Sequence, residues 1–243
     1  GSSQDPFAHV RDIMAASIES GADVGASFCA TIDGETVIDI WGGWADEAKT
    51  RPWEADTIVN VYSTTKTMTA LTALLIADRG ELDFDAPVAK YWPEFAQNGK
   101  TEVTVAQLMS HSSGLSGWEV PISREDLYDW DKATSLLAAQ APWWEPGTQV
   151  GYHAITQGYL VGEVVRRITG KSLGTVFREE IAEPLDADFH IGLAAEHDHR
   201  VADLIPPQVG AAQAAANNIQ RKTFTNPPIN PRDTRTREWR GAE

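Results

Sequence analysis

The sequence predicts an α/β fold in which an antiparallel β-hairpin near the N-terminus precedes a long helix-rich segment. Apolar residues in 7–20 recur at three- and four-residue steps, the spacing of an amphipathic helix. Two runs rich in β-branched and small apolar residues follow at 24–32 and 36–41, and Asp33-Gly34 between them suits a two-residue hairpin turn. Because an isolated hairpin is marginal in water, we expect further strands to complete the sheet.

The rest of the chain is predicted to be mainly helical. We expect five further helices, over residues 63–79, 104–110, 132–140, 156–169 and 173–181. Gly80 and Gly170 follow two of these segments and suit the left-handed position that ends a helix. Trp41-Gly42-Gly43 is interpreted as a strand end and turn. The pattern weakens from Pro206, where prolines become frequent.

Composition excludes several classes of partner. The 243 residues are 42% hydrophobic, which is enough for a core, and the formal net charge of −15 argues against nucleic acid or an anionic membrane. The single Cys29 excludes an internal disulfide and is expected to be a buried small hydrophobic residue. With neither a membrane-spanning run nor a signal peptide in the sequence, we expect a cytoplasmic protein. Residues 1–6 resemble a cloning remnant, so a native targeting segment could have been removed.

Ser63 and Lys66 form a Ser-x-x-Lys pair at the start of a predicted helix. A serine hydroxyl is a poor nucleophile until a base removes its proton. Residues three apart on a helix share a face, so the lysine amine can reach the serine directly. The N–H groups at the helix N-terminus would help to hold a developing oxyanion. The pair therefore indicates a serine acyl hydrolase or acyl transferase.

The same two residues also have a simpler interpretation. Ser63 could be a helix N-cap and Lys66 a solvated residue of the first turn. A Ser-x-x-Lys pair arises by chance about once in a chain of this length. From spacing alone, the catalytic and the capping interpretations are about equally well supported.

Several segments resemble the serine β-lactamase and penicillin-binding-protein superfamily. Residues 62–67 (Tyr-Ser-Thr-Thr-Lys-Thr) resemble its active-site helix, and residues 108–115 (Leu-Met-Ser-His-Ser-Ser-Gly-Leu) resemble its Leu-Leu-Thr-His-Thr-Ser-Gly-Leu loop. Residues 144–148 (Trp-Glu-Pro-Gly-Thr) with Tyr152 resemble its Pro-Gly-x-x-x-x-Tyr segment. Residues 159–165 and 170–173 resemble the helix behind it and the turn that follows. The pattern is most similar to class C β-lactamases and family VIII carboxylesterases.

This resemblance implies both a fold and a third catalytic residue. The fold is a β-lactamase-like antiparallel sheet flanked by helices, plus an all-helical subdomain. Tyr152 would join Ser63 and Lys66 by exchanging protons with the serine and the leaving group. Taken alone, Tyr152 would be interpreted as a buried aromatic residue with a satisfied hydroxyl. The chemistry passes through an acyl-enzyme on a small-molecule ester or amide and needs no metal or organic cofactor.

The sequence departs from the family pattern in two places. Where penicillin-recognising members have Tyr-x-Asn or Ser-x-Asn, this chain has Tyr152-His153-Ala154, which favours ester over β-lactam substrates. The third family motif, on a C-terminal strand beside the serine, has no suitable copy after Tyr152. Because family members are longer, we expect their C-terminal sheet strands to be absent from this chain. Either the chain is a fragment or, as we favour, a second polypeptide completes the fold, because an exposed half-sheet is unstable alone.

We therefore expect four segments. Residues 1–6 are the cloning remnant, and residues 7–62 contain the N-terminal helix and first strands of the α/β domain. Residues 63–205 form the helical subdomain with the active-site helix. Residues 206–243 form an extended, proline-rich tail that leads towards the missing C-terminal part.

Other functions stay open at this point. The same superfamily contains β-lactamases, amide hydrolases, acyltransferases and non-catalytic relatives that bind peptides or cell-wall fragments. A metal-binding role for His197-Asp198-His199 is less favoured than a solvated acidic loop, because no third ligand has a fixed spacing. Four tryptophans could line an apolar cleft or pack in a core: Trp118, Trp130, Trp143 and Trp144. His111 with Ser112 and Ser113 is interpreted as a structural loop.

Overall fold

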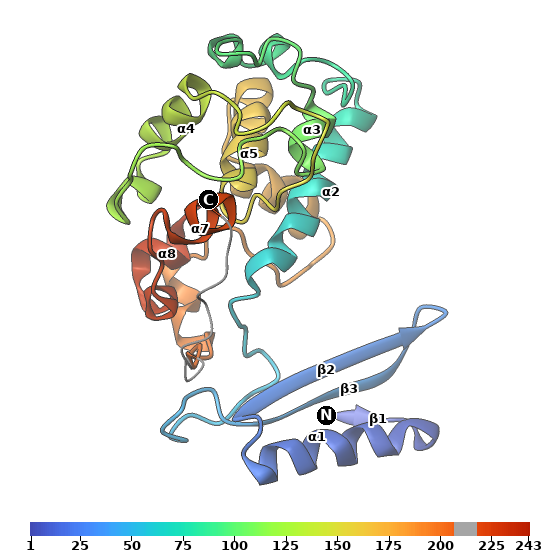
Figure 1. Ribbon diagram of the computed structural model, residues 1–243. Helices are drawn as coiled ribbons and strands as arrows, with labels where there is room; N and C mark the ends of the chain where they lie inside the picture. The colour runs from blue at the N-terminus through green and yellow to red at the C-terminus, as the bar shows by residue number, and fades with distance from the viewer. Residues whose placement is uncertain (207–217) are drawn as a thin grey trace. The chain divides into compact units, whose positions relative to one another are not determined.

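A computed structural model describes residues 1–206 and 218–243 (Figure 1). The chain divides into two compact units. The described part of the first unit comprises residues 1–60, 194–206 and 231–240. The described part of the second comprises residues 61–193, 218–230 and 241–243.

The first unit contains the predicted hairpin and the N-terminal helix. Helix α1 is Ala8–Ser20, strand β2 is Gly25–Ile32 and strand β3 is Glu35–Gly43. The turn residues Asp33 and Gly34 both have positive φ, 51° and 82°, as a type I′ turn requires. The helix covers one face of the sheet, and its apolar side packs on β3 (Figure 1). The core between them consists of Phe7, Val10, Met14, Ala30, Val37, Ile38 and Ile40.

Two expectations about the sheet are wrong. Residues 1–6 were excluded from the fold, but Ser2–Ser3 forms strand β1, which pairs antiparallel with β3 and gives the order β1-β3-β2. Cys29 was expected to be buried, but it is exposed. It lies opposite Asp39 in the register, whereas Ile38 and Ile40 belong to the core under α1. Since side chains alternate between faces, Cys29 lies on the face away from the helix.

The first unit also includes chain segments that the sequence assigned elsewhere. Residues 194–205 were predicted to belong to the helical subdomain, but Val201 forms a parallel bridge with Ile58 in the first unit. The Arg51 guanidinium donates to the carbonyl of Val201 at 3.2 Å. Such a long-range pairing leaves no local signal, which is why the predicted boundary differs.

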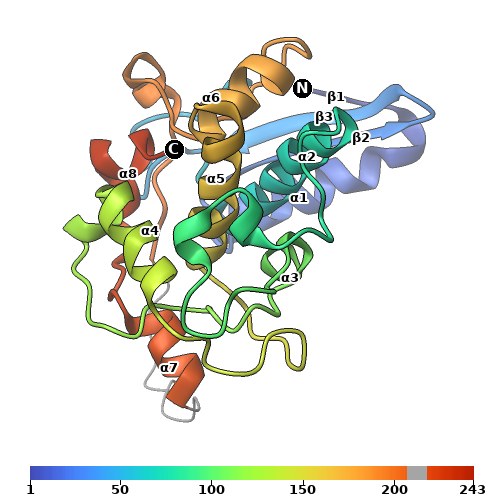
Figure 2. The ribbon, with the colours of Figure 1, turned by 90° about the horizontal axis from the view of Figure 1, so that it is seen from above.

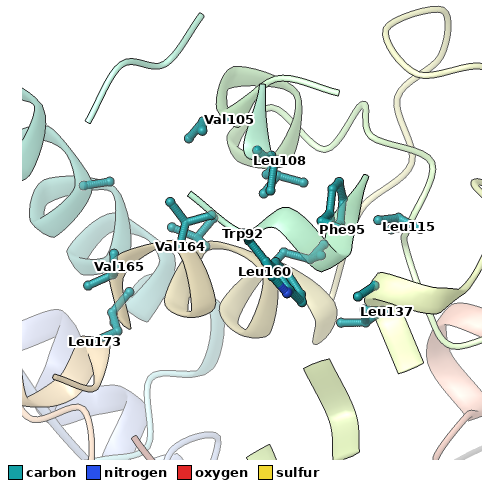
Figure 3. Close-up of a cluster of buried hydrophobic side chains, with 14 of the residues drawn as sticks. Trp92, Phe95, Val105, Leu108, Leu115, Leu137, Leu160, Val164, Val165 and Leu173 are labelled. Atoms are coloured by element: carbon teal, nitrogen blue, oxygen red, sulfur yellow. The ribbon is translucent and has the colours of Figure 1, made fainter. Parts of the chain in front are cut away.

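Helix α5, Thr156–Thr169, is the centre of the second unit (Figure 2). Four helices contact it: α2 (Thr65–Asp78), α3 (Val105–Met109), α4 (Trp130–Ala139) and α6 (Leu173–Phe177). Leu160, Val164 and Val165 of α5 are fully buried and meet Trp92 and Phe95 in the largest core cluster (Figure 3). The apolar face predicted for this helix is thus the face that is buried.

The predicted helix ends agree closely with the structure. Gly80 and Gly170 have the expected left-handed φ, 75° and 73°. Helix α3 begins with a capping box, in which Thr104 and Gln107 exchange side-chain to backbone hydrogen bonds. The helix predicted over 173–181 is an α-helix only to Phe177 and continues as a π-helical turn, Arg178–Ala182. The 3-10 segments are Asp5–Phe7, Tyr62–Thr64, Val88–Lys90, Pro93–Phe95, Glu125–Tyr128, Ala195–Arg200 and Pro231–Arg235.

The prediction of an extended tail over 206–243 is wrong for the described residues. This part contains α7 (Asn218–Thr225), a 3-10 helix and α8 (Arg237–Gly241). Tertiary contacts hold α7 and the residues after it: Thr223 is buried against Ser116 at 3.0 Å, and the Asn226 side chain donates to the Trp118 carbonyl at 2.9 Å. Within the described ranges, no helix combines the length and the apolar character needed to cross a bilayer.

Two charged side chains are almost completely buried in the second unit. The Lys100 ammonium donates to the carbonyls of Gln97 and Gln140, the second of which caps α4, and burial lowers the Lys100 pKa to about 8. Glu163 of α5 is 1% exposed and accepts hydrogen bonds from Arg166, Arg167 and Trp130 at 2.7 Å. Burial alone would raise the pKa of Glu163, but these three donors outweigh it and hold the pKa below its ordinary value.

We predict that Glu163→Gln lowers the free energy of unfolding at pH 7 by about 1–3 kcal/mol, because two arginines and an indole N–H lose a charged acceptor. The loss stays below that of a fully buried pair, since both arginines are partly exposed. Because the pKa of Glu163 is lowered in the folded state, its ionised form stabilises the folded protein above the unfolded pKa of about 4.3. This stabilisation is lost as the pH falls through the folded pKa. The difference from wild type should therefore close below about pH 4, as measured by urea unfolding.

The matched control is Glu102→Gln, an exposed carboxylate of the same unit. It should change the free energy of unfolding by less than about 0.5 kcal/mol. Equal unfolding midpoints for the Glu163 and Glu102 variants at pH 7 would contradict the prediction.

Candidate active site

Ser63 lies at a sharp change of backbone direction in front of α2. The 3-10 turn Tyr62–Thr64 runs directly into the helix, and Tyr62 has a left-handed φ of 45°. Such a conformation is unusual for a bulky residue and costs on the order of 1–3 kcal/mol, so surrounding contacts must hold it. The N-cap of α2 is Thr64. In the described part of the chain, the Ser63 N–H meets no backbone acceptor.

Lys66 follows Ser63 by one helical turn and turns its amine back to it. Its Nζ lies 3.4 Å from Ser63 Oγ and donates to the carbonyl oxygen of Ala154 at 2.8 Å. The side chain is half-buried. The Ala154 bond fixes the ammonium beside the serine, because a flexible lysine stem would otherwise sample many rotamers.

Tyr152 completes the group from a segment far away in the sequence. Its hydroxyl donates to Ser63 Oγ at 2.5 Å, and Lys66 Nζ lies 5.1 Å from the centre of its ring. The tyrosine is 42% exposed. The simpler interpretation of Tyr152 as a buried aromatic residue therefore does not hold. The structure thus brings together the three residues chosen from the sequence. Ser63 Oγ contacts a lysine and a tyrosine, and the N-cap role falls to another residue.

Two histidines, His111 and His153, lie next to Tyr152. The His111 ring centre is 4.9 Å from that of Tyr152, and His111 Nδ1 accepts from the backbone N–H of His153 at 3.1 Å. Burial, followed by the charge of Lys66, lowers the pKa of His111. Burial lowers the pKa of His153 to about 4. Both histidines are therefore neutral at pH 7.

The histidine contact with Tyr152 was missed in the sequence. The segment around His111 was interpreted as a structural loop, and His153 was noted only as a departure from the family pattern. The one available signal was that His111 lies in a family-like loop, but 41 positions separate it from Tyr152 in the sequence. Such a long-range contact has no periodicity that could reveal it.

The tryptophan cluster does not form a single feature. Trp118 is fully buried in the main core, and the Trp130 indole donates to Glu163. Trp143 donates to Glu119 at 2.6 Å, and its ring lies beside Lys222. Trp144 lies against Gly151, where a Cβ atom would come within 2.4 Å of its ring, so glycine is required beside Tyr152. Three of the four therefore have packing or hydrogen-bonding roles away from Tyr152, and only Trp144 borders its segment.

The histidines at 197 and 199 do not form a metal centre with their neighbours. Over residues 1–206 and 218–243, no group of three histidine, cysteine or acidic side chains is placed to hold a metal ion. Asp198 instead pairs with Arg237 at 2.6 Å and Arg240 at 3.4 Å in the first unit.

Comparison with known proteins places this geometry in a family. The family model named Beta-lactamase matches residues 10–224. The esterase/β-lactamase LipL of Mycobacterium tuberculosis is 43% identical over 203 residues, which cover 82% of this chain and 46% of LipL. The esterase EstB of Burkholderia gladioli is 34% identical over 179 residues, covering 67% of this chain and 45% of EstB.

Solved structures agree with the sequence comparison. A family VIII carboxylesterase superposes with a TM-score of 0.91 at 46% identity, covering 100% of this chain and 65% of the carboxylesterase. A penicillin-binding-protein homologue from Caulobacter crescentus gives 0.88 at 39% identity, covering 100% of this chain and 62% of the homologue. This chain spans about half the length of these curated relatives and somewhat less than two thirds of the solved structures.

The predicted superfamily and fold class are thus confirmed: an antiparallel sheet and many helices, with a match over most of the chain. The chain belongs to the β-lactamase family, within the serine β-lactamase and penicillin-binding-protein superfamily.

Proposed function

We propose that this protein is a serine hydrolase that cleaves carboxylic esters through an acyl-enzyme on Ser63. The observation that carries the proposal is the contact of Ser63 Oγ with two proton-transfer groups, Tyr152 Oη at 2.5 Å and Lys66 Nζ at 3.4 Å. The Tyr152 distance is short enough for direct proton transfer, and the Lys66 distance is slightly longer, as is common for catalytic hydrogen bonds before substrate binds. No metal or organic cofactor takes part in this chemistry.

The reaction has two steps. Ser63 Oγ attacks the ester carbonyl carbon, and its proton passes to Tyr152 or Lys66, whichever is deprotonated. The C–O bond to the leaving alcohol breaks, and the alkoxide oxygen takes up that proton. Water then attacks the acyl-enzyme, gives its proton to the same pair and releases the acid, while Ser63 recovers its proton.

The Lys66 to Ala154 bond has a specific place in this scheme. It keeps the amine within reach of Ser63 while Tyr152 contacts the serine from the other segment. Among the described residues, the Ser63 N–H meets no backbone acceptor, so it is suited to donate to the developing oxyanion. A second donor would have to come from elsewhere.

Ester substrates are favoured over β-lactams by residue 154. This position is an alanine, which offers the site only its main-chain carbonyl, and that carbonyl is taken by Lys66. A side-chain amide that could hold a substrate amide is thus replaced by a methyl group. The names of LipL, EstB and the family VIII carboxylesterase point in the same direction, although LipL is also named a β-lactamase.

We further propose that additional polypeptide, most simply a second chain, completes the C-terminal part of the fold. The order β1-β3-β2 leaves one edge of β2 without a partner strand among the described residues. Apolar side chains are also exposed on β2 and α2: Phe28 is 47% and Leu74 is 54% exposed. A strand edge and apolar surface of this kind favour pairing with further chain.

The first prediction concerns the nucleophile. A fluorophosphonate should label the protein at one position, and peptide mapping should find it on Ser63, because only this serine contacts both proton-transfer groups. Ser63→Ala should lose the label entirely. Ser110→Ala, at an exposed serine whose hydroxyl pairs with that of Ser112, is the matched control and should label like the wild type. A label on any other residue would show that the nucleophile is misassigned.

The second prediction concerns the proton-transfer groups. Lys66→Ala and Tyr152→Phe should each lower the turnover of a chromogenic short-chain ester by about 10²–10⁴-fold, the usual contribution of general acid–base catalysis. Circular dichroism should show both variants folded, since both side chains are at least partly exposed. Wild-type turnover in either variant refutes its assigned role.

The third prediction concerns completion of the site. The isolated chain should turn over esters about 10²–10³-fold more slowly than the completed protein, the cost of one missing oxyanion donor. Native mass spectrometry of the protein isolated from its source should show a species heavier than 26.5 kDa. Full ester turnover by a species of only that mass would contradict the proposal.

A further inference from the structure

His111 holds the segment around Tyr152 at three points. Its carbonyl oxygen accepts from the N–H of Gly151 at 3.0 Å, and its Nδ1 accepts from the N–H of His153 at 3.1 Å. Between these bonds its ring packs against the Tyr152 ring, with centres 4.9 Å apart. One residue thus fixes the main chain on both sides of the tyrosine and one face of its side chain.

The bonds define which nitrogen of each ring carries the proton. His111 Nδ1 accepts from a backbone N–H and must be unprotonated, so the neutral ring has its proton on Nε2. His153 Nε2 accepts from the Leu115 N–H at 3.3 Å, and its Nδ1 donates to the Gly151 carbonyl at 2.5 Å. A second proton on His111 would have to go on Nδ1, where it would displace the His153 N–H.

The surroundings of His111 favour its neutral form. The titratable groups that face it are Lys66, Tyr152 and the His153 ring, whose centre is 5.4 Å away. Burial and the Lys66 charge both lower the pKa of His111. The side-chain nitrogen of Gln157 donates to the Met109 carbonyl and lies 3.5 Å from His111 Nε2; it is a donor like the Nε2–H, so no hydrogen bond joins the two in this tautomer.

We propose that His111 is a positioning residue that holds Tyr152 against Ser63 through its Nδ1 bond to the His153 N–H and its ring contact. Among the described residues, the Ser63 hydroxyl is bonded to Lys66 and Tyr152 and not to His111, so His111 acts through Tyr152. This inference rests on the catalytic role proposed for Tyr152. A shift of about 1 Å in a catalytic group can cost on the order of 10²-fold in rate, so a clamp of this kind has a measurable effect.

The backbone of His111 allows a clean set of variants. Its φ is +63°, a left-handed conformation that glycine and asparagine tolerate. His111→Gly keeps this backbone and the carbonyl bond but removes the ring and the Nδ1 acceptor. His111→Asn restores an acceptor oxygen near the Nδ1 position, without a ring and without a titration. Asp186→Gly, at another left-handed position with φ +50° and an exposed side chain, is the matched control.

The first readout is the rate of Ser63 labelling by a fluorophosphonate at pH 8. We expect His111→Gly to be about 10–100-fold slower than wild type, His111→Asn to recover to within about 5-fold, and Asp186→Gly to be unchanged. With a chromogenic ester, the loss should fall on kcat rather than KM. At a pH low enough to protonate His111, whose pKa lies below the ordinary value of about 6.5, the labelling rate of His111→Asn relative to wild type should rise, because only the wild type protonates the acceptor.

The second readout does not depend on activity. Amide hydrogen exchange at His153 should be at least about 10-fold faster in His111→Gly than in wild type, and it should be slow again in His111→Asn. If wild-type Ser63 takes no label, the proposed function is wrong, and the exchange comparison alone decides whether His111 holds this segment. Wild-type labelling and exchange in folded His111→Gly, or an equal loss in Asp186→Gly, would overturn the positioning role.

Discussion

The candidate site depends on the docking of residues 151–154 onto the first turn of α2. The bond from Lys66 Nζ to the Ala154 carbonyl, 2.8 Å long, is the link between the two segments beside the serine. It satisfies a half-buried ammonium and places Tyr152 next to Ser63 in the same step. Together with the bond from the Tyr152 hydroxyl to Ser63 Oγ, it joins the two segments next to the serine.

That docking is supported by the packing of α5, which follows the segment directly. The helix buries Leu160, Val161, Val164 and Val165 against its neighbours, so its start is held rigidly. His111 accepts hydrogen bonds from main-chain N–H groups on both sides of Tyr152. The same hydrogen bonds also hold the loop that carries His111, because the N–H groups of Gly151 and His153 both donate to His111. The proposed reaction therefore relies on polar groups held by a core, not on flexible surface residues.

This chain spans about half the length of the curated relatives, and the sheet of the first unit bears on the proposal of further polypeptide. The described part of the sheet has three strands, and β2 offers an unpaired edge. Cys29 and Phe28 are exposed on this strand although the surrounding run is apolar. Apolar runs in a sequence predict burial only when the surface that covers them is present.

The sequence by itself determined the elements whose signals are local. Helical spacing located α1, α2 and α5, and the Asp33-Gly34 turn located the hairpin. Spacing placed Ser63 and Lys66 on one helix face, and the resemblance of several segments to one family favoured their catalytic interpretation. Only the tertiary structure decided the contacts that join distant segments. These include the approach of Tyr152 to Ser63, the clamp by His111, the helical tail and the strand formed by Ser2–Ser3. Periodicity and turn chemistry act over a few residues, whereas these contacts arise from packing across tens of residues or more.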